Sequence, residues 1–421
     1  MPHKLPVILI FCVTYLLMML KRERAVLIVY AGCFLLLAGG LIKPLDALSS
    51  VNLNVLGIFA GTMILSELFV FSNVPAFLAE RIVSKSKKTF IALLGVCALT
   101  AIISSVVENV VTVLIVAPIA LEVAKKLKVS PVPFLIGIAI SANLQGCATM
   151  VGDSPSILLA TSSGMGFLDF FWFKGRPGIT FAVELGALGA FFVLYLFFKK
   201  YTQMPPAAGK VKIKTLVPGV LMTLLLLSLA AVSLLPRKPY YIYAILCLSF
   251  AVVGLIWHEI YHKESLSLLR DLDWKTLFFL IGIFVLVGSL THAGIISDLA
   301  GAIGSVTKNN TFLAYSLVVW MSLFLSAFVD NIPYTMAMIP VAKLLAAQVG
   351  ASPYLFLFGL LVGTCLGGNI TPIGASANVA AIGFMKKHGY SVKFSDFFKI
   401  GFPFSVVAVG IAYIFLWFVW R

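Results

Sequence analysis

Long apolar runs separated by short polar segments make up most of the chain. A transmembrane helix needs about 20 predominantly apolar residues, and several of these runs come close to that length. They cover residues 5–20, 25–43, 53–72, 178–198, 215–235, 239–257, 276–291 and 400–420. The pattern predicts an all-α polytopic membrane protein.

Four further apolar segments differ from these runs, because polar and glycine residues interrupt each of them near its centre. Residues 89–124 and 311–349 each predict two short helices joined at a polar turn, and residues 132–160 and 353–385 each predict a broken transmembrane helix. Helix ends inside a membrane survive only where protein buries them or where they line a wet cavity. We therefore expect two re-entrant hairpins and two broken helices around a central polar cavity.

An internal repeat accounts for this recurrence. After a shift of 222 residues, 104–156 aligns with 326–378 without gaps, and 16 of the 53 positions are identical. The identities include Ser, Asn, Pro and Gly, whereas chance alignment of apolar helices would match Leu and Val. We expect N-terminal helices at 1–44, a first repeat at 45–200, a linker with two helices at 201–275 and a second repeat at 276–421.

The composition agrees with an integral membrane protein, since 61% of the residues are hydrophobic, only 11% are charged and the mean hydropathy is +1.07. Soluble domains have roughly 25% charged residues, so soluble enzymes and nucleic-acid-binding proteins are excluded. Lys and Arg accumulate in cytoplasmic loops, and we interpret the net charge of +15 in that way. We expect a multi-pass protein of the plasma (inner) membrane.

The distribution of Lys and Arg tests the hairpins. With the loop 21–24 in the cytoplasm and 89–124 re-entrant from that side, 22 of the 31 basic residues lie inside and 9 outside. A single crossing by 89–124 would invert every later segment and remove this bias. The second hairpin then opens to the outside, so the repeats are inverted. In secondary transporters with inverted repeats the binding site lies near the midplane of the membrane.

The polar residues at the interruptions form the candidate binding site. Glycines permit the backbone turns of broken helices, helix termini present N–H groups or carbonyl oxygens, and Ser, Thr and Asn add neutral ligands. The candidate substrate- or ion-binding residues are Ser104, Glu108, Asn109, Gly146, Thr149, Gly152, Asp153, Ser154, Ser326, Asp330, Asn331, Gly368, Asn369, Thr371, Gly374, Ser376 and Asn378.

Three of these residues, Glu108, Asp153 and Asp330, carry charge at membrane depth, where an unpaired charge costs about 2.5 kcal/mol or more. Glu108 and Asp330 occupy equivalent hairpin tips, and each precedes an asparagine, Asn109 or Asn331, which predicts a sodium or proton site at each tip. A bound cation favours the ionised carboxylate, whereas burial away from water favours the protonated carboxyl group. Exchange between these two forms can couple transport to an ion gradient. The structural alternative is that these acids only cap helices.

These motifs resemble the ion transporter superfamily over nearly the full chain. Residues 108–113 (Glu-Asn-Val-Val-Thr-Val), followed by Pro118, resemble the first-hairpin motif of the arsenite efflux pump, P-protein and NhaD-type antiporter branch. Residues 152–155 (Gly-Asp-Ser-Pro) resemble a Gly-Asp-Pro-Pro run of the P protein, and residues 368–378 are similar to the second-half signature of arsenite-pump-like permeases. Such domains are often labelled citrate transporter-like. The resemblance implies a homodimer, an elevator-type transport domain, and one cation site at each hairpin tip with its broken helix.

The tips depart from the dicarboxylate carriers of that superfamily, which have Ser-Asn-Thr at both. Here residues 108–110 are Glu-Asn-Val and residues 330–332 are Asp-Asn-Ile, so hydroxyl groups are lost and negative charge is added. We therefore expect a proton- or sodium-coupled secondary transporter for a small inorganic ion or solute, through arsenite or antimonite efflux or through sodium/proton antiport. Cation-driven uptake of a citrate-like di- or tricarboxylate is the alternative, and an ion channel is a more distant one.

No enzymatic activity and no cofactor other than coupling Na⁺ or H⁺ is expected, because the chain has no P-loop and no His-Glu-x-x-His motif inside a predicted membrane span. The expected partners are the substrate, the lipid bilayer and a second copy of the chain, with no nucleic acid. Cys147 and Cys365 flank the broken helices and would suit a thiophilic solute such as arsenite, or they serve only as small packing residues.

Overall fold

A computed structural model describes residues 4–205 and 211–421. The described part is helical, as predicted, apart from a short antiparallel ribbon that the prediction did not include, formed by β1 (Trp172–Phe173) and β2 (Arg176–Pro177). Lys210, one of the basic residues assigned to the cytoplasm, lies outside the described residues.

The first repeat begins at α4 and contains the predicted hairpin and broken helix. Its helices are α4 (Leu53–Phe71), α5 (Val74–Lys85), α6 (Thr89–Ser104), α7 (Asn109–Lys126), α8 (Val132–Gly146), α9 (Ser154–Ser163), η2 (Leu168–Phe170) and α10 (Ile179–Phe198). The hairpin consists of α6 and α7, and the two halves of the broken helix are α8 and α9.

The second repeat has the same order of α-helices, but its 3-10 helix lies in the break of the broken helix, whereas η2 follows α9. Its helices are α14 (Trp274–His292), α15 (Ile295–Val306), α16 (Thr311–Ser326), α17 (Asn331–Gln348), α18 (Pro353–Gly367), η3 (Gly368–Ile370), α19 (Ser376–Lys387) and α20 (Phe394–Trp420). The shift of 222 residues maps α6 and α7 onto α16 and α17 at both ends, and each second hairpin helix has an internal proline, Pro118 or Pro340. The two predicted repeats, each with a hairpin and a broken helix, are confirmed.

Other helices precede the repeats or connect them. They are α1 (Lys4–Leu20), η1 (Arg22–Arg24), α2 (Ala25–Ala38), α3 (Pro44–Ser50), α11 (Val217–Ser233), α12 (Ile242–His262) and α13 (Ser265–Asp271). Among the described helices, six are long and apolar enough to cross a membrane. The predicted span 25–43 is too long, because α2 ends before Gly39 and the short helix α3 begins at Pro44.

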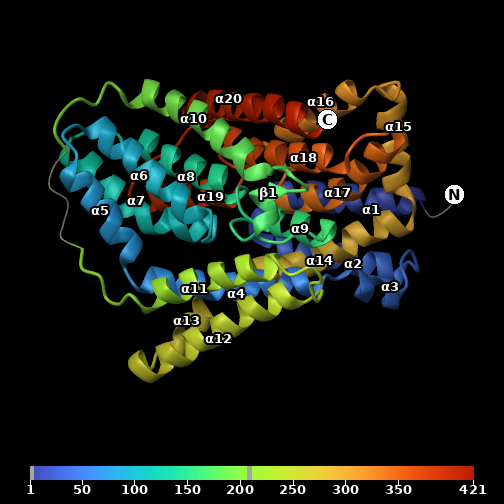
Figure 1. Cartoon of the computed structure of the whole chain (residues 1–421), viewed down its shortest axis with the longest axis horizontal. Coiled ribbons are helices and arrows are strands. Elements are labelled where there is room, and N and C mark those ends of the chain that lie inside the picture. The colour runs from blue at the N-terminus through green and yellow to red at the C-terminus, as the bar shows by residue number, and fades with distance from the viewer. Residues whose placement is uncertain (1–3, 206–210) are drawn as a thin grey trace.

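The helices form two groups, seen one above the other in Figure 1. Helices α4, α11, α12 and α14 lie in the lower part of the view, and the hairpins, the broken helices, α10 and α20 lie above them. Helices α8 and α18 run through the upper group and are almost wholly buried, and α10 packs along α20. The half-helices of the two repeats therefore end in the interior of the molecule.

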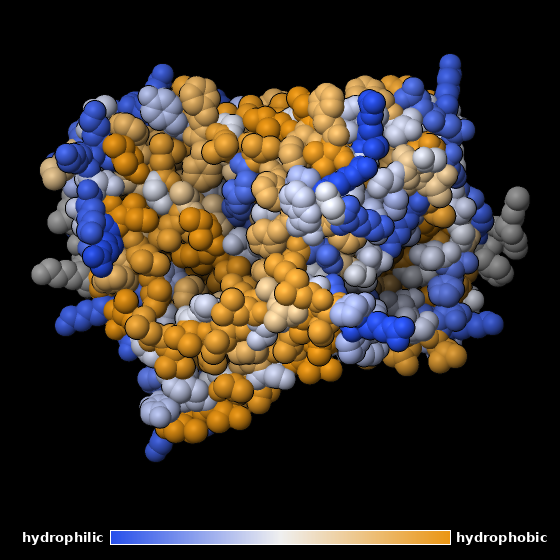
Figure 2. All heavy atoms as spheres, viewed as in Figure 1, coloured by the Kyte–Doolittle hydropathy of each residue, from blue (hydrophilic) through white to orange (hydrophobic). Residues whose placement is uncertain are grey.

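The outer surface is that of a protein surrounded by lipid. In Figure 2 hydrophilic residues gather towards the left and right ends, and hydrophobic side chains cover most of the surface between them. Leu27, Leu188 and Phe418 are 71%, 73% and 77% exposed. Exposed apolar surface on this scale marks contact with a membrane, so the left and right ends of the view correspond to its two faces. Helix α5 lies towards the left end, and α3 and α15 lie at the right end.

Candidate functional site

The three acids predicted at membrane depth are all N-caps of half-helices. Glu108 Oε2 accepts a hydrogen bond from the N–H of Val111 at 3.0 Å at the start of α7. Asp330 Oδ1 accepts from the N–H of Ile332 at 3.1 Å at the start of α17, and Asp153 Oδ1 from the N–H of Ser154 at 2.8 Å at the start of α9. Capping is thus one role of each acid, and all three also border a cavity.

At the first tip, oxygen atoms from the hairpin and the broken helix converge. The Ser104 hydroxyl donates to Asn109 Oδ1, and the Thr149 hydroxyl donates to the carbonyl oxygen of Ser105. A Cβ atom at Gly152 would lie only 2.6 Å from the carbonyl oxygen of Gly146 and 2.7 Å from that of Ser105. A residue without a side chain is therefore required for the broken helix to approach the tip.

The second tip has the same arrangement. The Ser326 hydroxyl donates to Asn331 Oδ1 at 2.5 Å, and the Thr371 hydroxyl donates to the carbonyl oxygen of Ala327. A Cβ atom at Gly374 would lie 2.9 Å from the Ala327 carbonyl oxygen and closer still to that of Gly368. Each tip thus gathers hydroxyl, amide and carbonyl oxygens, the ligand types that suit hard cations.

A small inner cavity of about 50 Å³ lies between the two tips. Four carboxylates line it, from Glu108, Asp153, Asp330 and Asp273, and none of the described residues that line it is basic. Asp273 is a site residue that sequence reasoning missed. It caps α14, where its carboxylate accepts from the N–H of Thr276 at 3.2 Å and from its hydroxyl at 2.5 Å.

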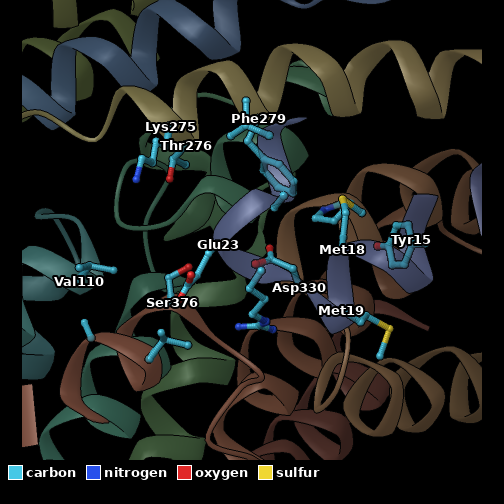
Figure 3. A pocket seen from close by; sticks show the side chains of 16 residues that line it. Tyr15, Met18, Met19, Glu23, Val110, Lys275, Thr276, Phe279, Asp330 and Ser376 are labelled. Carbon is cyan, nitrogen blue, oxygen red and sulfur yellow. The ribbon is translucent and has the colours of Figure 1, made fainter. Parts of the chain in front are cut away.

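A wider cavity of about 380 Å³ adjoins the inner one and shares Asp330 with it. Figure 3 shows side chains of α1, α14, α17 and α19 around this space, with Asp330 and Ser376 near its centre. Arg22, Glu23 and Lys275 also line it. These three belong to segments that the distribution of Lys and Arg assigns to the cytoplasm, and under that prediction the wider cavity leads towards the cytoplasmic side.

The structure brings the predicted site residues together in two layers. The first layer lines the inner cavity and contains Glu108, Asn109, Asp153, Ser154, Asp330, Asn331 and Ser376. The second layer supports the tips from behind and contains Ser104, Gly146, Thr149, Gly152, Ser326, Gly368, Asn369, Thr371, Gly374 and Asn378. Asn143 lines the inner cavity as well. It was missed as a ligand because its counterpart under the repeat is a cysteine, Cys365.

The two cysteines that flank the broken helices, Cys147 and Cys365, are fully buried and lie against each other and close to Asp153. Neither of them lines the two cavities formed by the described residues. Their position is that of packing residues between the repeats.

Comparison with known proteins identifies relatives over the whole length of the chain. The family model described as citrate transporter matches residues 15–363. A 46 kDa membrane protein of Mycobacterium leprae is 28% identical, and the match covers 97% of each chain. The P protein of Homo sapiens is 27% identical, and the match covers 86% of this chain and 53% of that protein.

Solved structures show the same fold at low sequence identity. The YdaH transporter of Alcanivorax borkumensis superposes with a TM-score of 0.58 at 14% identity, over 91% of this chain and 87% of that one. MtrF of Neisseria gonorrhoeae, described as illuminating a class of antimetabolite efflux pumps, superposes with a TM-score of 0.57 at 14% identity, over 92% and 84%. These structures confirm the fold, and the family model and the match to the P protein confirm the resemblance drawn from the tip motifs.

Proposed function

Because the chain belongs to the citrate transporter family and is an integral multi-pass membrane transporter rather than an enzyme, we propose that it is a secondary transporter driven by sodium ions or protons. The coupling ion binds at the hairpin tips, where Glu108 with Asn109 and Asp330 with Asn331 supply oxygen ligands. No ligand set for another cofactor is proposed.

The observation that carries this proposal is the acidic lining of the inner cavity. Four carboxylates surround about 50 Å³ of space, and no basic residue among the described ones lines it. Drug-sized ligands occupy pockets of about 300–1,000 Å³, so this space suits an ion or a few water molecules. The clustered negative charge attracts a small cation and repels a free carboxylate anion. Sodium/proton antiport is therefore the activity that the site supports best.

The arrangement of the cavities also supports alternating access of the elevator type. The hairpins and broken helices form one group, and α4, α11, α12 and α14 form another, with the inner cavity at the boundary between them. We propose that the first group carries the tips across the membrane while the second forms a static dimeric scaffold. With the wider cavity leading to the cytoplasm, the described conformation corresponds to an inward-facing state.

A second candidate, cation-coupled transport of a citrate-like carboxylate, is favoured by the wider cavity. Its volume of about 380 Å³ is in the range of organic ligands, and the side chains of Arg22 and Lys275 line it. A carboxylate would bind there with the coupling cation on Asp330. Arsenite efflux is less favoured, because the Cys147 and Cys365 thiols line neither cavity.

Flux measurements on the purified protein in proteoliposomes test these candidate functions. Sodium and pH gradients are imposed separately, and the fluxes of sodium, arsenite and citrate are followed against empty vesicles. Sodium uptake driven by an outward proton gradient, without arsenite or citrate flux, is the expected result. Citrate flux that requires a sodium or proton gradient would establish the second candidate, and conductance without coupling to either gradient would indicate a channel.

A further inference from the structure

We propose that Asn143 is a positioning residue that links the two hairpin tips, so that cation binding at one tip changes the affinity at the other. This inference rests on the proposed function and concerns the regulation of the same site. It follows from a chain of hydrogen-bonded amide side chains that crosses from the first repeat to the second.

The chain begins in the second repeat at Asn378. Asn378 Nδ2 donates to the carbonyl oxygens of Gly368 at 2.8 Å and Thr371 at 2.9 Å. Asn378 Oδ1 accepts from Asn143 Nδ2 at 3.0 Å, and the same nitrogen donates to Asn369 Oδ1 at 2.8 Å. Asn143 and Asn378 are buried, with exposed fractions of 2% and 0%.

The chain ends at the first tip. Asn143 Oδ1 accepts from Asn109 Nδ2 at 3.4 Å, and Asn109 Oδ1 accepts from the Ser104 hydroxyl. Asn109 Oδ1 is also the amide oxygen that this tip offers to a cation. Asn143 is therefore the single side chain through which the described amides of the two repeats are joined.

The directions of the Asn378 and Asn143 amides are set by backbone atoms of the second repeat. Carbonyl oxygens can only accept hydrogen bonds, so the Asn378 amino group must face them and its oxygen must face Asn143. The Asn143 amino group must then point to Asn378, which leaves its oxygen to accept from Asn109. Reversal of any one amide would bury unpaired polar atoms and would lower the folding equilibrium constant several-fold or more.

A cation at the second tip would act on the start of this chain. The Gly368 carbonyl oxygen lies beside Gly374, where the broken helix meets the tip, and it already accepts from Asn378. A cation on that oxygen repels the Asn378 N–H dipole that shares it. The resulting displacement of the Asn378 amide is transmitted through Asn143 to Asn109 Oδ1. Binding at the second tip thereby changes the affinity of the first, which is thermodynamic coupling between two sites.

The internal repeat supplies a natural comparison, because three amide residues of this hydrogen-bonded chain have counterparts that are not amides. The counterparts of Asn143, Asn369 and Asn378 are Cys365, Cys147 and Ser156, whose thiol and hydroxyl groups cannot make such an amide chain. Cys365 and Ser156 are both fully buried. The fold therefore accepts cysteine and serine at equivalent positions, and the variants N143C and N378S copy residues that the protein already uses there.

The test measures cooperativity in proteoliposomes. Flux is recorded as the driving ion is varied at constant ionic strength, with sodium or pH as the titrant according to which gradient drives the wild type. We expect a Hill coefficient above 1 for the wild type and close to 1 for both N143C and N378S, with a half-saturating concentration raised about fivefold or more. S141A is the matched control, since Ser141 is buried on the same helix and faces Cys97; it should keep the wild-type cooperativity.

Elution as a single species in size-exclusion chromatography identifies the variants that fold. N143C removes the bond between Asn143 and Asn109, whereas N378S removes the bond from Asn378 to the Gly368 carbonyl oxygen. A Hill coefficient of 1 in the wild type overturns the inference and leaves the proposed function standing. Wild-type cooperativity in either folded variant overturns it as well. Absence of flux under both gradients in the wild type would overturn the proposed function and this inference together.

Discussion

Replacement of Asp330 by Asn separates the two roles that the structure gives this residue. Asp330 caps α17 through the bond from the Ile332 N–H at 3.1 Å, and it is the carboxylate shared by the two cavities. Asn keeps an oxygen in the capping position, because Asn and Asp are about equally good N-caps. It removes the negative charge.

The two effects differ in size. The free energy of unfolding of D330N should stay close to that of the wild type, whereas D330A loses the cap at a cost of about 1 kcal/mol. A cation about 4 Å from a carboxylate gains roughly 4 kcal/mol near a protein surface, which corresponds to about a thousandfold in affinity. Even if desolvation cancels half of that gain, D330N should bind the coupling ion tens of times more weakly, and flux at ordinary gradients should be lost.

The assay is ion-driven flux in proteoliposomes with D330N, D330A and the wild type at equal protein content. Melting temperature measured in detergent reports the cap separately. We expect D330N to melt with the wild type and to show no coupled flux, and D330A to melt earlier and to show none. Coupled flux of D330N at the wild-type rate would refute the assignment of Asp330 as an ion ligand.

Three further predictions address the tips and the orientation. G374A places a Cβ atom 2.9 Å from the Ala327 carbonyl oxygen and should abolish transport, while G383A, at a glycine with open space around it, should leave flux unchanged; equal fluxes would contradict the close approach at the second tip. In a background without the exposed Cys12, S376C should react with a membrane-impermeant maleimide added from the cytoplasmic side and not from outside, and the reverse pattern would contradict an inward-facing cavity. An epitope tag after Arg421 should be accessible to antibody on intact cells, and protection of the tag would contradict the charge-based topology.

The fold was largely predictable because the repeat carries polar landmarks. A match of apolar residues alone would not have fixed the register, but Asn109, Asn331, Gly152 and Gly374 align in one shift. The structure gives a physical reason for each pair. The asparagines accept from a hairpin serine, and the glycines allow a backbone contact that a Cβ atom would block.

Apart from Asn143, the part of the site that could not be predicted comes from outside the repeat motifs. Arg22 and Glu23 were interpreted as a cytoplasmic loop, and they do lie at the end of α1, but they line the wider cavity as well. Asp273 precedes an apolar run and looks like an ordinary helix start. Hydropathy indicates how deep such residues lie in the membrane but not the direction in which their side chains face. Whether they line a cavity depends on how α1 and α14 pack against the hairpins, which the sequence pattern does not show.

That packing also breaks the symmetry between the two tips. Glu108 lies against α4, where its backbone N–H donates to the Ser66 hydroxyl at 3.4 Å. The counterpart of Ser66 in the second repeat is Gly288, which has no hydroxyl to accept such a bond. Asp330 borders both the inner and the wider cavity, while Glu108 borders the inner cavity and not the wider one. In the proposed inward-facing state the second tip has the shorter path to the cytoplasm, so we expect its ion to be released first, and the proposed amide chain would transmit this loss of charge to the first tip. Two tips of nearly identical chemistry can in this way empty in a fixed order, because the helices around them are different.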